Sequence, residues 1–377
     1  MIAVVMAGGL GTRLHPLSCL LPKPMLSFFD RPLLSYILQK LLENGFRRVL
    51  LTLHYRPEAI MHYFGDGAER GLQIAYSLER EPLGTAGSVR HAVRELGEAV
   101  VVLSGDVLFN FNLAPALSFH CQRGALVTML LLHHHDPRGF GIAALDHDGR
   151  VTRYCEKPAT PHDVFSNLIN TGTYFLEPEA LDLIPPQAFF DFSRDLFPLL
   201  LKRGMPFYGY VVQGYWSDLG TLEVYRQAHD AAFEGKGGIL IPGEQKGPQI
   251  WMEEGVNIAT GARLHPPLFL GARVCLEKGA VAGPGAVIGA DTVIRRGSRV
   301  MNSILGKGNH VGVGALLDGA FLAGNNVIGE HCCLREMVVL GGNCRVAERS
   351  TLQHDVKIWP HLYLPPRTRL EHATITQ

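Results

Sequence analysis

Hydrophobic residues in the first half of the chain alternate between short continuous runs and one-sided helical patterns. Residues 2–6 and 49–53 are uninterrupted apolar runs, which are typical of strands buried on both faces of a sheet. Between them, leucines and an isoleucine recur on one helical face over residues 33–42, and Gly45 follows as a stop. The pattern therefore predicts strand, helix, strand in that order.

Two further segments, 72–77 and 100–103, have the composition of strands and are separated by helical patterns. This repetition predicts an α/β domain with a Rossmann-like, mostly parallel sheet and helices on both faces. We expect the first helix to open at Asp30-Arg31-Pro32, with Asp30 as its cap and Pro32 in its first turn.

After about residue 250 the hydrophobic period changes to six, with glycines nearby. A six-residue repeat is typical of a parallel β-helix, in which inward aliphatic residues of stacked coils form one column. Three hexads to a coil predict about six coils, with a loop or irregular coil where the phase slips between Val300 and Leu316. The first run is Ile258, Leu264, Leu270, Leu276, Ala282, Ile288, Ile294 and Val300, and the second is Leu316, Leu322, Ile328, Leu334, Leu340, Val346, Leu352 and Ile358.

Length supports this division, because 377 residues exceed what one compact core usually holds. We expect a catalytic α/β domain over residues 1–233 and a β-helix domain over 251–377. The intervening segment 234–250 is rich in glycine and charge and is the natural linker.

Charge and composition narrow the function class. The formal net charge is zero, whereas nucleic-acid binders normally have a basic excess. The seven cysteines form no C-x-x-C pair, which favours reduced thiols over a disulfide framework or zinc site. No apolar run approaches the roughly 20 residues of a membrane span, and the N-terminal run lacks a basic leader. We expect a cytoplasmic protein that binds neither nucleic acid nor membrane.

A glycine-rich segment, residues 6–13, follows the first predicted strand. Its three glycines let the backbone approach a ligand and point N–H groups at it, and Arg13 adds a donor fork suited to phosphate. Lys23 offers a second cation. A tight turn that needs glycine is the alternative. The segment is not a Walker loop, and Leu14 stands where a dinucleotide fingerprint has its third glycine.

The string from Gly8 to Met25 resembles the signature of the sugar-1-phosphate nucleotidyltransferases, or NDP-sugar pyrophosphorylases. Departures from the usual pattern, at Ser18, Ser104 and Leu222, replace no charged group. A C-terminal hexapeptide-repeat, left-handed β-helix is also common in this family, notably among members like mannose-1-phosphate guanylyltransferase. Five later segments match family motifs in order, namely residues 81–87 (base), 104–106 (metal), 156–158 (sugar phosphate), 170–172 (sugar hydroxyls) and 216–221 (second metal).

The resemblance implies attack by a sugar-1-phosphate oxygen on the α-phosphorus of a nucleoside triphosphate, with release of pyrophosphate. The nucleophile is already an anion, so catalysis is mainly positioning and charge neutralisation. Asp106 and Asp218 are the implied Mg²⁺ ligands. For Asp106, as a lone Gly-Asp pair, a turn aspartate at a strand end is the simpler alternative. Asp106 also follows a predicted strand, at the edge where open α/β sheets bind ligands.

The remaining implied roles divide between the two substrates. Arg13 and Lys23 hold the triphosphate, and Lys157 binds the sugar phosphate, although a surface ion pair with Glu156 is the simpler reading of that dipeptide. Nucleotide contacts are implied for Ala7, Gly8, Gly9, Gly11, Thr12, Arg13, Glu81, Gly84 and Thr85, and sugar-phosphate contacts for Glu156, Lys157, Asn170 and Gly172.

The resemblance favours GTP and mannose 1-phosphate, but glucose 1-phosphate with UTP, dTTP or CTP, or a heptose phosphate, stays open. A non-catalytic nucleotide-sugar sensor is a further alternative. Hexapeptide β-helices also occur in acyltransferases that use a histidine as base, for which His310, His331 and His354 are available. We expect instead a regulatory or oligomerising β-helix, in a homo-oligomer. The run 133–135 is three histidines, but neighbours in a strand point to opposite faces, which disfavours a shared metal.

Overall fold

The computed structural model describes residues 1–9 and 11–376, so Leu10 of the glycine-rich segment lies outside the described residues. The chain forms two compact units and passes between them three times. Unit 1 contains residues 1–9 and 34–218. Unit 2 contains residues 219–376 together with residues 11–33, which we call the signature segment.

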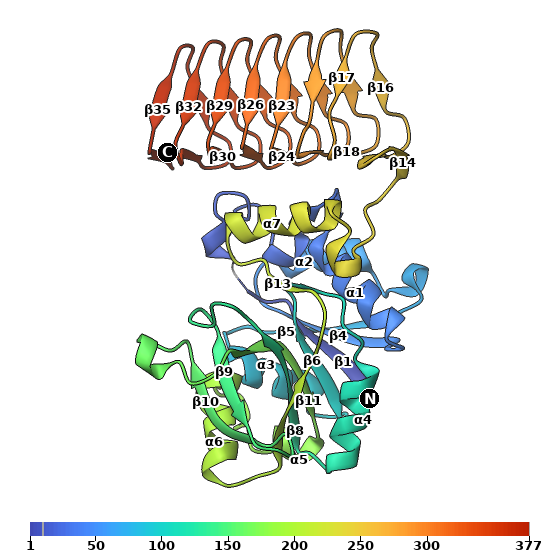
Figure 1. The fold of residues 1–377 in the computed structure, drawn as a ribbon, viewed down its shortest axis with the longest axis vertical. Coiled ribbons are helices and arrows are strands. Elements are labelled where there is room, and N and C mark those ends of the chain that lie inside the picture. Colours follow the sequence, from blue (N-terminus) through green and yellow to red (C-terminus); the bar gives the residue numbers. More distant parts are fainter. Residues whose placement is uncertain (10, 377) are drawn as a thin grey trace. The chain divides into compact units, whose positions relative to one another are not determined.

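Unit 1 is built on a mixed nine-stranded sheet in which β10-β9-β11-β6-β1-β4-β5 lie in that order, and β8 pairs with β11 and β12 (Figure 1). Pairing is parallel from β6 through β1 and β4 to β5, and antiparallel around β11. The strands are β1 (Ile2–Met6), β4 (Arg48–Leu53), β5 (Gln73–Leu78), β6 (Val100–Ser104), β8 (Val127–His133), β9 (Gly141–Leu145), β10 (Val151–Glu156), β11 (Leu168–Leu176) and β12 (Phe207–Val211).

Helices cover the sheet, so that successive residues of β1 are buried on both of its faces. Helix α3 contacts β1, β4 and β5, and α4 contacts β8 and β12. A short ribbon pairs β7 (Val107–Phe109) with β13 (Trp216–Asp218). The helices are α1 (Leu33–Glu43), α2 (Pro57–Phe64), α3 (Gly84–Val93), α4 (Ala114–Arg123), α5 (Pro178–Leu181) and α6 (Phe197–Lys202), with a π-helical turn at Phe192–Leu196 and 3₁₀ turns at Ala68–Arg70 and Pro161–Asp163.

The predicted α/β fold is confirmed, and its four predicted strands lie within one residue of the expected bounds. The predicted helix start is wrong. Residues Ser27–Phe28 (β2) and Arg31–Pro32 (β3) form a hairpin, and α1 begins only at Leu33. Asp30 lies in the hairpin turn with φ 63° and does not cap the helix.

Unit 2 contains the predicted parallel β-helix, whose short strands stack coil upon coil in three sheets (Figure 1). Sheet D consists of β14 (Glu244–Gly247), β15 (Ile250–Met252), β18 (Leu268–Leu270), β21 (Ala286–Ile288), β24 (Ile304–Leu305), β27 (Phe321–Leu322), β30 (Val339–Leu340), β33 (Lys357–Ile358) and β36 (Thr374–Ile375). Within the predicted linker, β14 pairs antiparallel with β15.

The other two sheets have seven strands each, one coil more than the expected six. Sheet E consists of β16 (Asn257–Ile258), β19 (Cys275–Leu276), β22 (Val293–Ile294), β25 (His310–Val311), β28 (Val327–Ile328), β31 (Arg345–Val346) and β34 (Tyr363–Leu364). Sheet F consists of β17 (Arg263–Leu264), β20 (Val281–Ala282), β23 (Arg299–Met301), β26 (Leu316–Asp318), β29 (Cys333–Arg335), β32 (Thr351–Gln353) and β35 (Arg369–Glu371).

The phase slip has a simpler cause than the predicted loop or irregular coil. Leu305 pairs with Ile288 and Leu322, so two successive coils are 17 residues long. The last coil, from β33 to β36, also has 17 residues, whereas the other coils have 18. In each of these shortened coils, one residue is missing from the corner between sheet F and sheet D, so the strand pairing continues without interruption. As a result Leu317, which is fully buried, points inward in place of the predicted Leu316.

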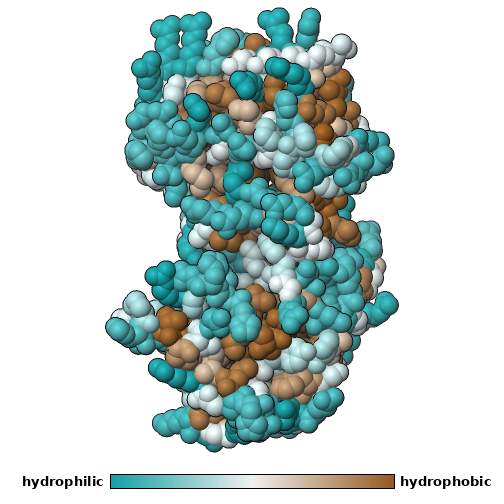
Figure 2. Space-filling view, in the orientation of Figure 1, coloured by the Kyte–Doolittle hydropathy of each residue, from teal (hydrophilic) through white to brown (hydrophobic). Residues whose placement is uncertain are grey.

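Besides the β-helix, unit 2 contains the hairpin β2–β3, the helix α7 (Leu222–Phe233), and 3₁₀ turns at Thr12–Leu14, Lys23–Met25 and Lys236–Gly238. The face seen in Figure 2 is hydrophilic over much of both units, with smaller hydrophobic areas. In the part of the chain that the structure describes, no helix is both long and apolar enough to cross a bilayer.

Candidate active site

A cavity of about 330 Å³ in unit 1 gathers residues from five of the matched motifs. It opens where β1, β6, β10 and β13 end, beside the middle of β11. Its lining includes the predicted Thr85, Asp106, Glu156, Lys157, Asn170, Gly172 and Asp218, and also Met6, Ser104, Val107, Gly139, Phe140, Gly141, Thr171, Tyr174, Asp191, Phe192, Ser193, Arg194 and Trp216.

Two carboxylates meet at this cavity because β7 and β13 pair. Asp106 follows Gly105, whose N–H donates to the Met6 carbonyl over 2.8 Å; a Cβ at Gly105 would lie only 2.6 Å from that oxygen. Asp218 is opposite Val107, the residue after Asp106. The Ser104 hydroxyl donates to Asp106 Oδ1 over 2.5 Å and fixes the orientation of the carboxylate.

The donor set suits a hard divalent cation. Magnesium prefers carboxylate oxygens and completes its shell with water and phosphate oxygens, so two carboxylates suffice on the protein side. Among the described residues no group of three or more His, Cys, Asp or Glu side chains could hold a metal. His133 instead lies within hydrogen-bond distance of Asn167, and His134 of Asp136.

Glu156 is held at the end of β10 by a tyrosine. Its Oε2 lies 2.7 Å from the hydroxyl of Tyr154, which is also 2.9 Å from Ser193 Oγ. Burial raises the pKa of Tyr154 above its ordinary value, so the phenol remains a donor. Gly141 pairs with Glu156, and a Cβ there would collide with the Tyr154 hydroxyl, so only glycine leaves room for this contact.

Lys157 projects its ammonium into solvent at the cavity. Its backbone has φ 47°, and its N–H donates to the Phe140 carbonyl over 3.1 Å. The Nζ lies 3.9 Å from Glu156 Oε1, at the outer limit of an ion pair, and the side chain is 65% exposed. Exposed pairs contribute about 0–1 kcal/mol, so this contact does not hold Lys157 away from a phosphate.

Asn170 and Gly172 lie at an irregularity in β11. The pairing with β8 shifts register between Asn170 and Tyr174, and such bulges often re-aim side chains beside active sites. The Asn170 amide donates to the Tyr174 hydroxyl over 2.8 Å and accepts from the Gly172 N–H over 2.9 Å. Gly172 has φ 74°, and a Cβ there would be 3.3 Å from Ser104 Cβ, so glycine also permits close approach to β6.

The start of α3 is tied to a segment that sequence reasoning missed. The Thr85 hydroxyl donates to Asp191 Oδ2 over 2.7 Å and accepts from the Phe192 N–H over 2.9 Å. A Cβ at Gly84 would lie 2.7 Å from the Phe190 carbonyl oxygen. Asp191 caps the following turn, and its Asp-x-Ser sequence was the available signal. Glu81 is exposed and is not in the cavity lining.

The glycine-rich segment is divided between the two units. In unit 1, the Ala7 N–H donates to the Thr52 carbonyl, and a Cβ at Gly8 would be 3.2 Å from the His54 nitrogen, whereas Gly9 has open space. Gly8 therefore serves close packing, and Gly9 leaves the backbone accessible.

In unit 2, Gly11 has φ 64°, and its missing Cβ makes room for the Lys23 side chain, which is 95% buried. Thr12 and Arg13 are exposed on the following 3₁₀ turn. The Arg13 guanidinium lies against Gly220, where a Cβ would be 2.9 Å from its Nη2. Gly220, in the last matched motif, therefore leaves the space that the Arg13 side chain of the first motif occupies.

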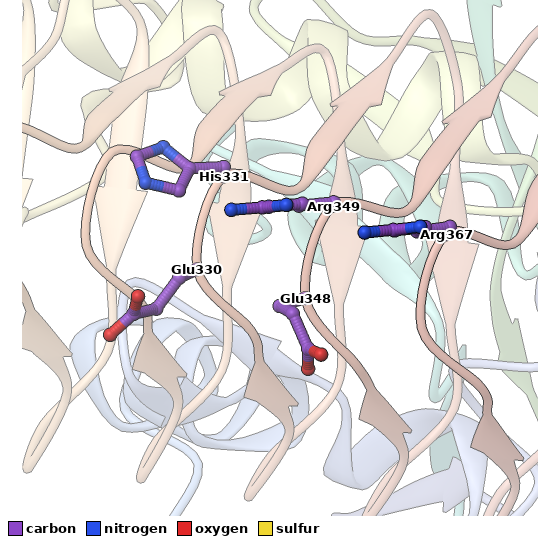
Figure 3. A pocket seen from close by; sticks show the side chains of 5 residues that line it. All are labelled: Glu330, His331, Glu348, Arg349 and Arg367. Carbon is purple, nitrogen blue, oxygen red and sulfur yellow. The ribbon is translucent and has the colours of Figure 1, made fainter.

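A second hollow, of about 310 Å³, lies on the β-helix and includes one histidine of the acyltransferase alternative. Figure 3 shows His331, Arg349 and Arg367 in a row on successive coils, with Glu330 and Glu348 along the other side. All five side chains are exposed, and within the described residues none of them forms an ion pair.

Comparison with known proteins finds a matching family model for both parts of the chain. Residues 2–234 match the family model described as "Nucleotidyl transferase", and residues 264–369 match the "GMPPB C-terminal domain". The chain is 32% identical to a UTP–glucose-1-phosphate uridylyltransferase of Synechocystis, covering 84% of this chain and 86% of that protein. It is 34% identical to a mannose-1-phosphate guanylyltransferase of Mycobacterium tuberculosis, covering 85% and 79% respectively.

The fold has a counterpart among solved structures. A Bacillus anthracis protein described as a glucose-1-phosphate thymidylyltransferase superposes with a TM-score of 0.56 at 22% identity. The match covers 62% of this chain and 95% of that one.

Proposed function

The chain belongs to the nucleotidyl transferase family, and on this premise we propose that it transfers a guanylyl group from GTP to mannose 1-phosphate, giving GDP-mannose and pyrophosphate. The observation that carries the proposal is the unit 1 cavity, where the pairing of β7 with β13 brings Asp106 and Asp218 together. Glu156, Lys157 and Asn170 belong to the same lining. Two carboxylates suited to a metal ion and a cation suited to a phosphate, in a single cavity, fit a reaction between two phosphate esters.

In the proposed reaction, a phosphate oxygen of the sugar phosphate forms a bond to the α-phosphorus, and the bond from that phosphorus to the bridging oxygen of pyrophosphate breaks. No proton has to move, because the nucleophile is an anion and pyrophosphate leaves as one. The protein's task is to align the two esters and offset their repulsion. Magnesium bound by Asp106 and Asp218 would supply compensating positive charge.

In this proposal, different side chains at the cavity bind the phosphate and the sugar of the sugar phosphate. Lys157 is the cation for its phosphate, since its ammonium is exposed and only weakly paired. Glu156 and Asn170 are held rigidly by Tyr154 and Tyr174 and can hydrogen-bond sugar hydroxyls. Arg13, Lys23 and the open backbone at Gly9 are the proposed contacts of the triphosphate.

Support for the guanine base and the mannose sugar comes from relatives. The C-terminal match is to a domain named for GMPPB, and full-length relatives include mannose-1-phosphate guanylyltransferases. The Synechocystis relative, with a similar identity, is named a uridylyltransferase, so UTP is the competing nucleotide.

A substrate panel tests the proposal. Purified protein with Mg²⁺ is incubated with GTP, UTP, dTTP, CTP or ATP, each against mannose, glucose or heptose 1-phosphate, and pyrophosphate release is followed. We expect release to be fastest with GTP and mannose 1-phosphate and to stop on chelation by EDTA. A faster rate with another pair corrects the substrates. No release with any pair overturns the enzymatic role and favours a nucleotide-sugar sensor.

A parallel assay addresses the acyltransferase alternative. The protein is offered acetyl-CoA and the nucleotide sugar made in the panel, and free thiol is measured. Thiol release that is lost in His331→Ala would establish a second activity in the β-helix, and no release above the protein-free control rejects it for this acyl donor.

A further inference from the structure

The signature segment shares its compact unit with the β-helix rather than with the sheet whose first strand precedes it. This segment carries Arg13 and Lys23, the proposed triphosphate contacts. It reaches the β-helix through the turn of the β2–β3 hairpin, where Phe29 and Asp30 both have positive φ, 45° and 63°. A turn strained at two consecutive non-glycine residues needs compensating contacts.

Asp30 makes a polar contact between the segment and the β-helix. Its Oδ2 accepts a hydrogen bond of 2.7 Å from the Ala290 N–H. Ala290 lies two residues after the end of β21, a strand of sheet D. Two glycines of consecutive coils border the carboxylate. A Cβ at Gly271 would lie 2.9 Å from Oδ2, and one at Gly289 would lie 3.0 Å from Oδ1. The corner therefore has room for a carboxylate.

Charged groups of the β-helix surround this carboxylate unevenly. Arg273 and Lys307 attract it, and Asp291, which is paired with Arg273 over 2.6 Å, repels it. Burial has the largest effect and raises the pKa of Asp30. A partly buried acid retained at this cost indicates a specific position rather than a solvated surface charge.

Aromatic packing adds to the contact. Phe29 is fully buried, with ring centroids 5.5 Å from Phe269 of β18 and 5.1 Å from Phe233 of α7. The Tyr225 hydroxyl of α7 donates to the Ser27 carbonyl. The hairpin is thus enclosed between α7 and sheet D.

A second contact lies earlier in the signature segment and further along the coils. The Leu20 side chain packs on Gly342, where a Cβ would be 2.8 Å from Leu20 Cδ1. The His15 and Trp359 rings meet edge to face with centroids 6.3 Å apart. The segment is therefore held against several coils of one β-helix face, on either side of Lys23.

We propose that sheet D of the β-helix is part of the nucleotide-binding apparatus, and that Asp30 is a positioning residue that fixes the segment carrying Arg13 and Lys23. The identity of the nucleotide rests on the proposed function, whereas the contacts that hold residues 11–33 against the β-helix do not. It gives the β-helix an indirect part in substrate binding, through the position of the signature segment, beyond the regulatory or oligomerising part that its repeat suggests.

The test compares Asp30→Ala with Asp30→Asn in the full-length protein. Alanine removes the acceptor for the Ala290 N–H, whereas asparagine keeps an acceptor oxygen. We expect Asp30→Ala to speed amide hydrogen exchange across residues 11–33 about tenfold and to raise KM for GTP about tenfold, with KM for mannose 1-phosphate changed less than twofold. Asp30→Asn should stay within about threefold of the parent on all three measurements.

Gly342→Val repeats the test from the β-helix side, because its side chain displaces Leu20 and touches no proposed substrate contact. The matched control is Val327→Ala, on an exposed position of sheet E. Unchanged exchange over residues 11–33 in both Asp30→Ala and Gly342→Val overturns the anchor. Equal increases in both KM values overturn the positioning role. Faster exchange in a protein whose parent turns over no substrate pair retains the anchor and rejects the proposed function.

Discussion

Asp218 lies directly opposite Val107 in the β7–β13 ribbon, one residue from Asp106. These residues are more than a hundred positions apart in sequence, yet antiparallel pairing places their backbones side by side. Directly opposed residues in such a pair have Cα atoms about 4.5–5.5 Å apart. Asp106 directly precedes β7 and Asp218 is the last residue of β13, so the pairing of these strands brings the two proposed metal ligands close together.

Asp106→Asn should abolish magnesium-dependent pyrophosphate release while leaving the thermal unfolding midpoint within about 2 °C of the parent. The amide keeps the shape of the side chain but removes the charge that binds a hard cation. Asp148→Asn, an exposed turn position, is the matched control. A variant that turns over at the parental rate would show that Asp106 is not a metal ligand.

Tyr154→Phe should weaken the binding of the sugar phosphate. It removes the hydroxyl that orients Glu156, and a hydrogen bond to a charged group contributes about 1.5–3 kcal/mol, of which an indirect effect transmits part. We expect KM for mannose 1-phosphate to rise about five- to tenfold, with KM for GTP unchanged. Tyr208→Phe serves as the control, and an equal rise in both variants would rule out this role.

Gly220→Ala should raise KM for GTP about fivefold. The added methyl would lie 2.9 Å from the Arg13 guanidinium and push that flexible end aside without a backbone clash. Steady-state kinetics of Gly220→Ala, Arg13→Ala and the double variant provide the check. If Gly220 acts through Arg13, the double variant is no worse than Arg13→Ala; additive losses would contradict the link.

His229→Phe should reduce the loss of stability in acid. Burial among Phe28, Phe29 and Tyr225 lowers the pKa of His229 to about 3 from an ordinary 6.5. The folded protein therefore keeps His229 neutral, while the unfolded chain protonates it below pH 6.5. The stability tied to neutral His229 is complete above pH 6.5 and declines as pH falls toward 3, with a slope of up to about 1.4 kcal/mol per pH unit.

The replacement also removes Nε2, which is buried without a hydrogen-bond partner among the described residues, at the cost of the Nδ1 contact with the Tyr225 carbonyl. Urea unfolding at pH 4, 5, 6 and 7.5 checks the prediction. The advantage of the variant over the parent should grow as pH falls; a constant difference would mean that His229 is protonated in the folded protein.

The sequence patterns that were easiest to interpret were those with a strict period. Buried residues such as Val4 and Leu51 form continuous runs because both faces of their strands are covered, and the hexad aliphatics repeat because every coil has the same shape. Such patterns depend only on local geometry and burial, which a sequence displays directly.

The errors arose where distant residues decide local structure. Asp30 before a proline and an apolar helical face has the local chemistry of a cap, but its carboxylate bonds to Ala290, and the segment forms a hairpin. Leu316 and Leu317 are equally apolar, so the shortened corners that select Leu317 are invisible without strand pairing. The part played by Asp191 at the cavity depends on contacts with Thr85 across 106 positions.

The Asp30 contact also bears on the order of events during synthesis. Asp30 leaves the ribosome 260 residues before Ala290, an interval of roughly 13–52 s at 5–20 residues per second. Until α7 (Leu222–Phe233) is synthesised, within that interval, Phe28 and Phe29 have neither α7 nor the β-helix to cover them, although the strands of unit 1 are by then available to fold. The nascent chain therefore carries an uncovered apolar hairpin during this time. The hairpin is a natural binding site for chaperones and a site of aggregation during refolding.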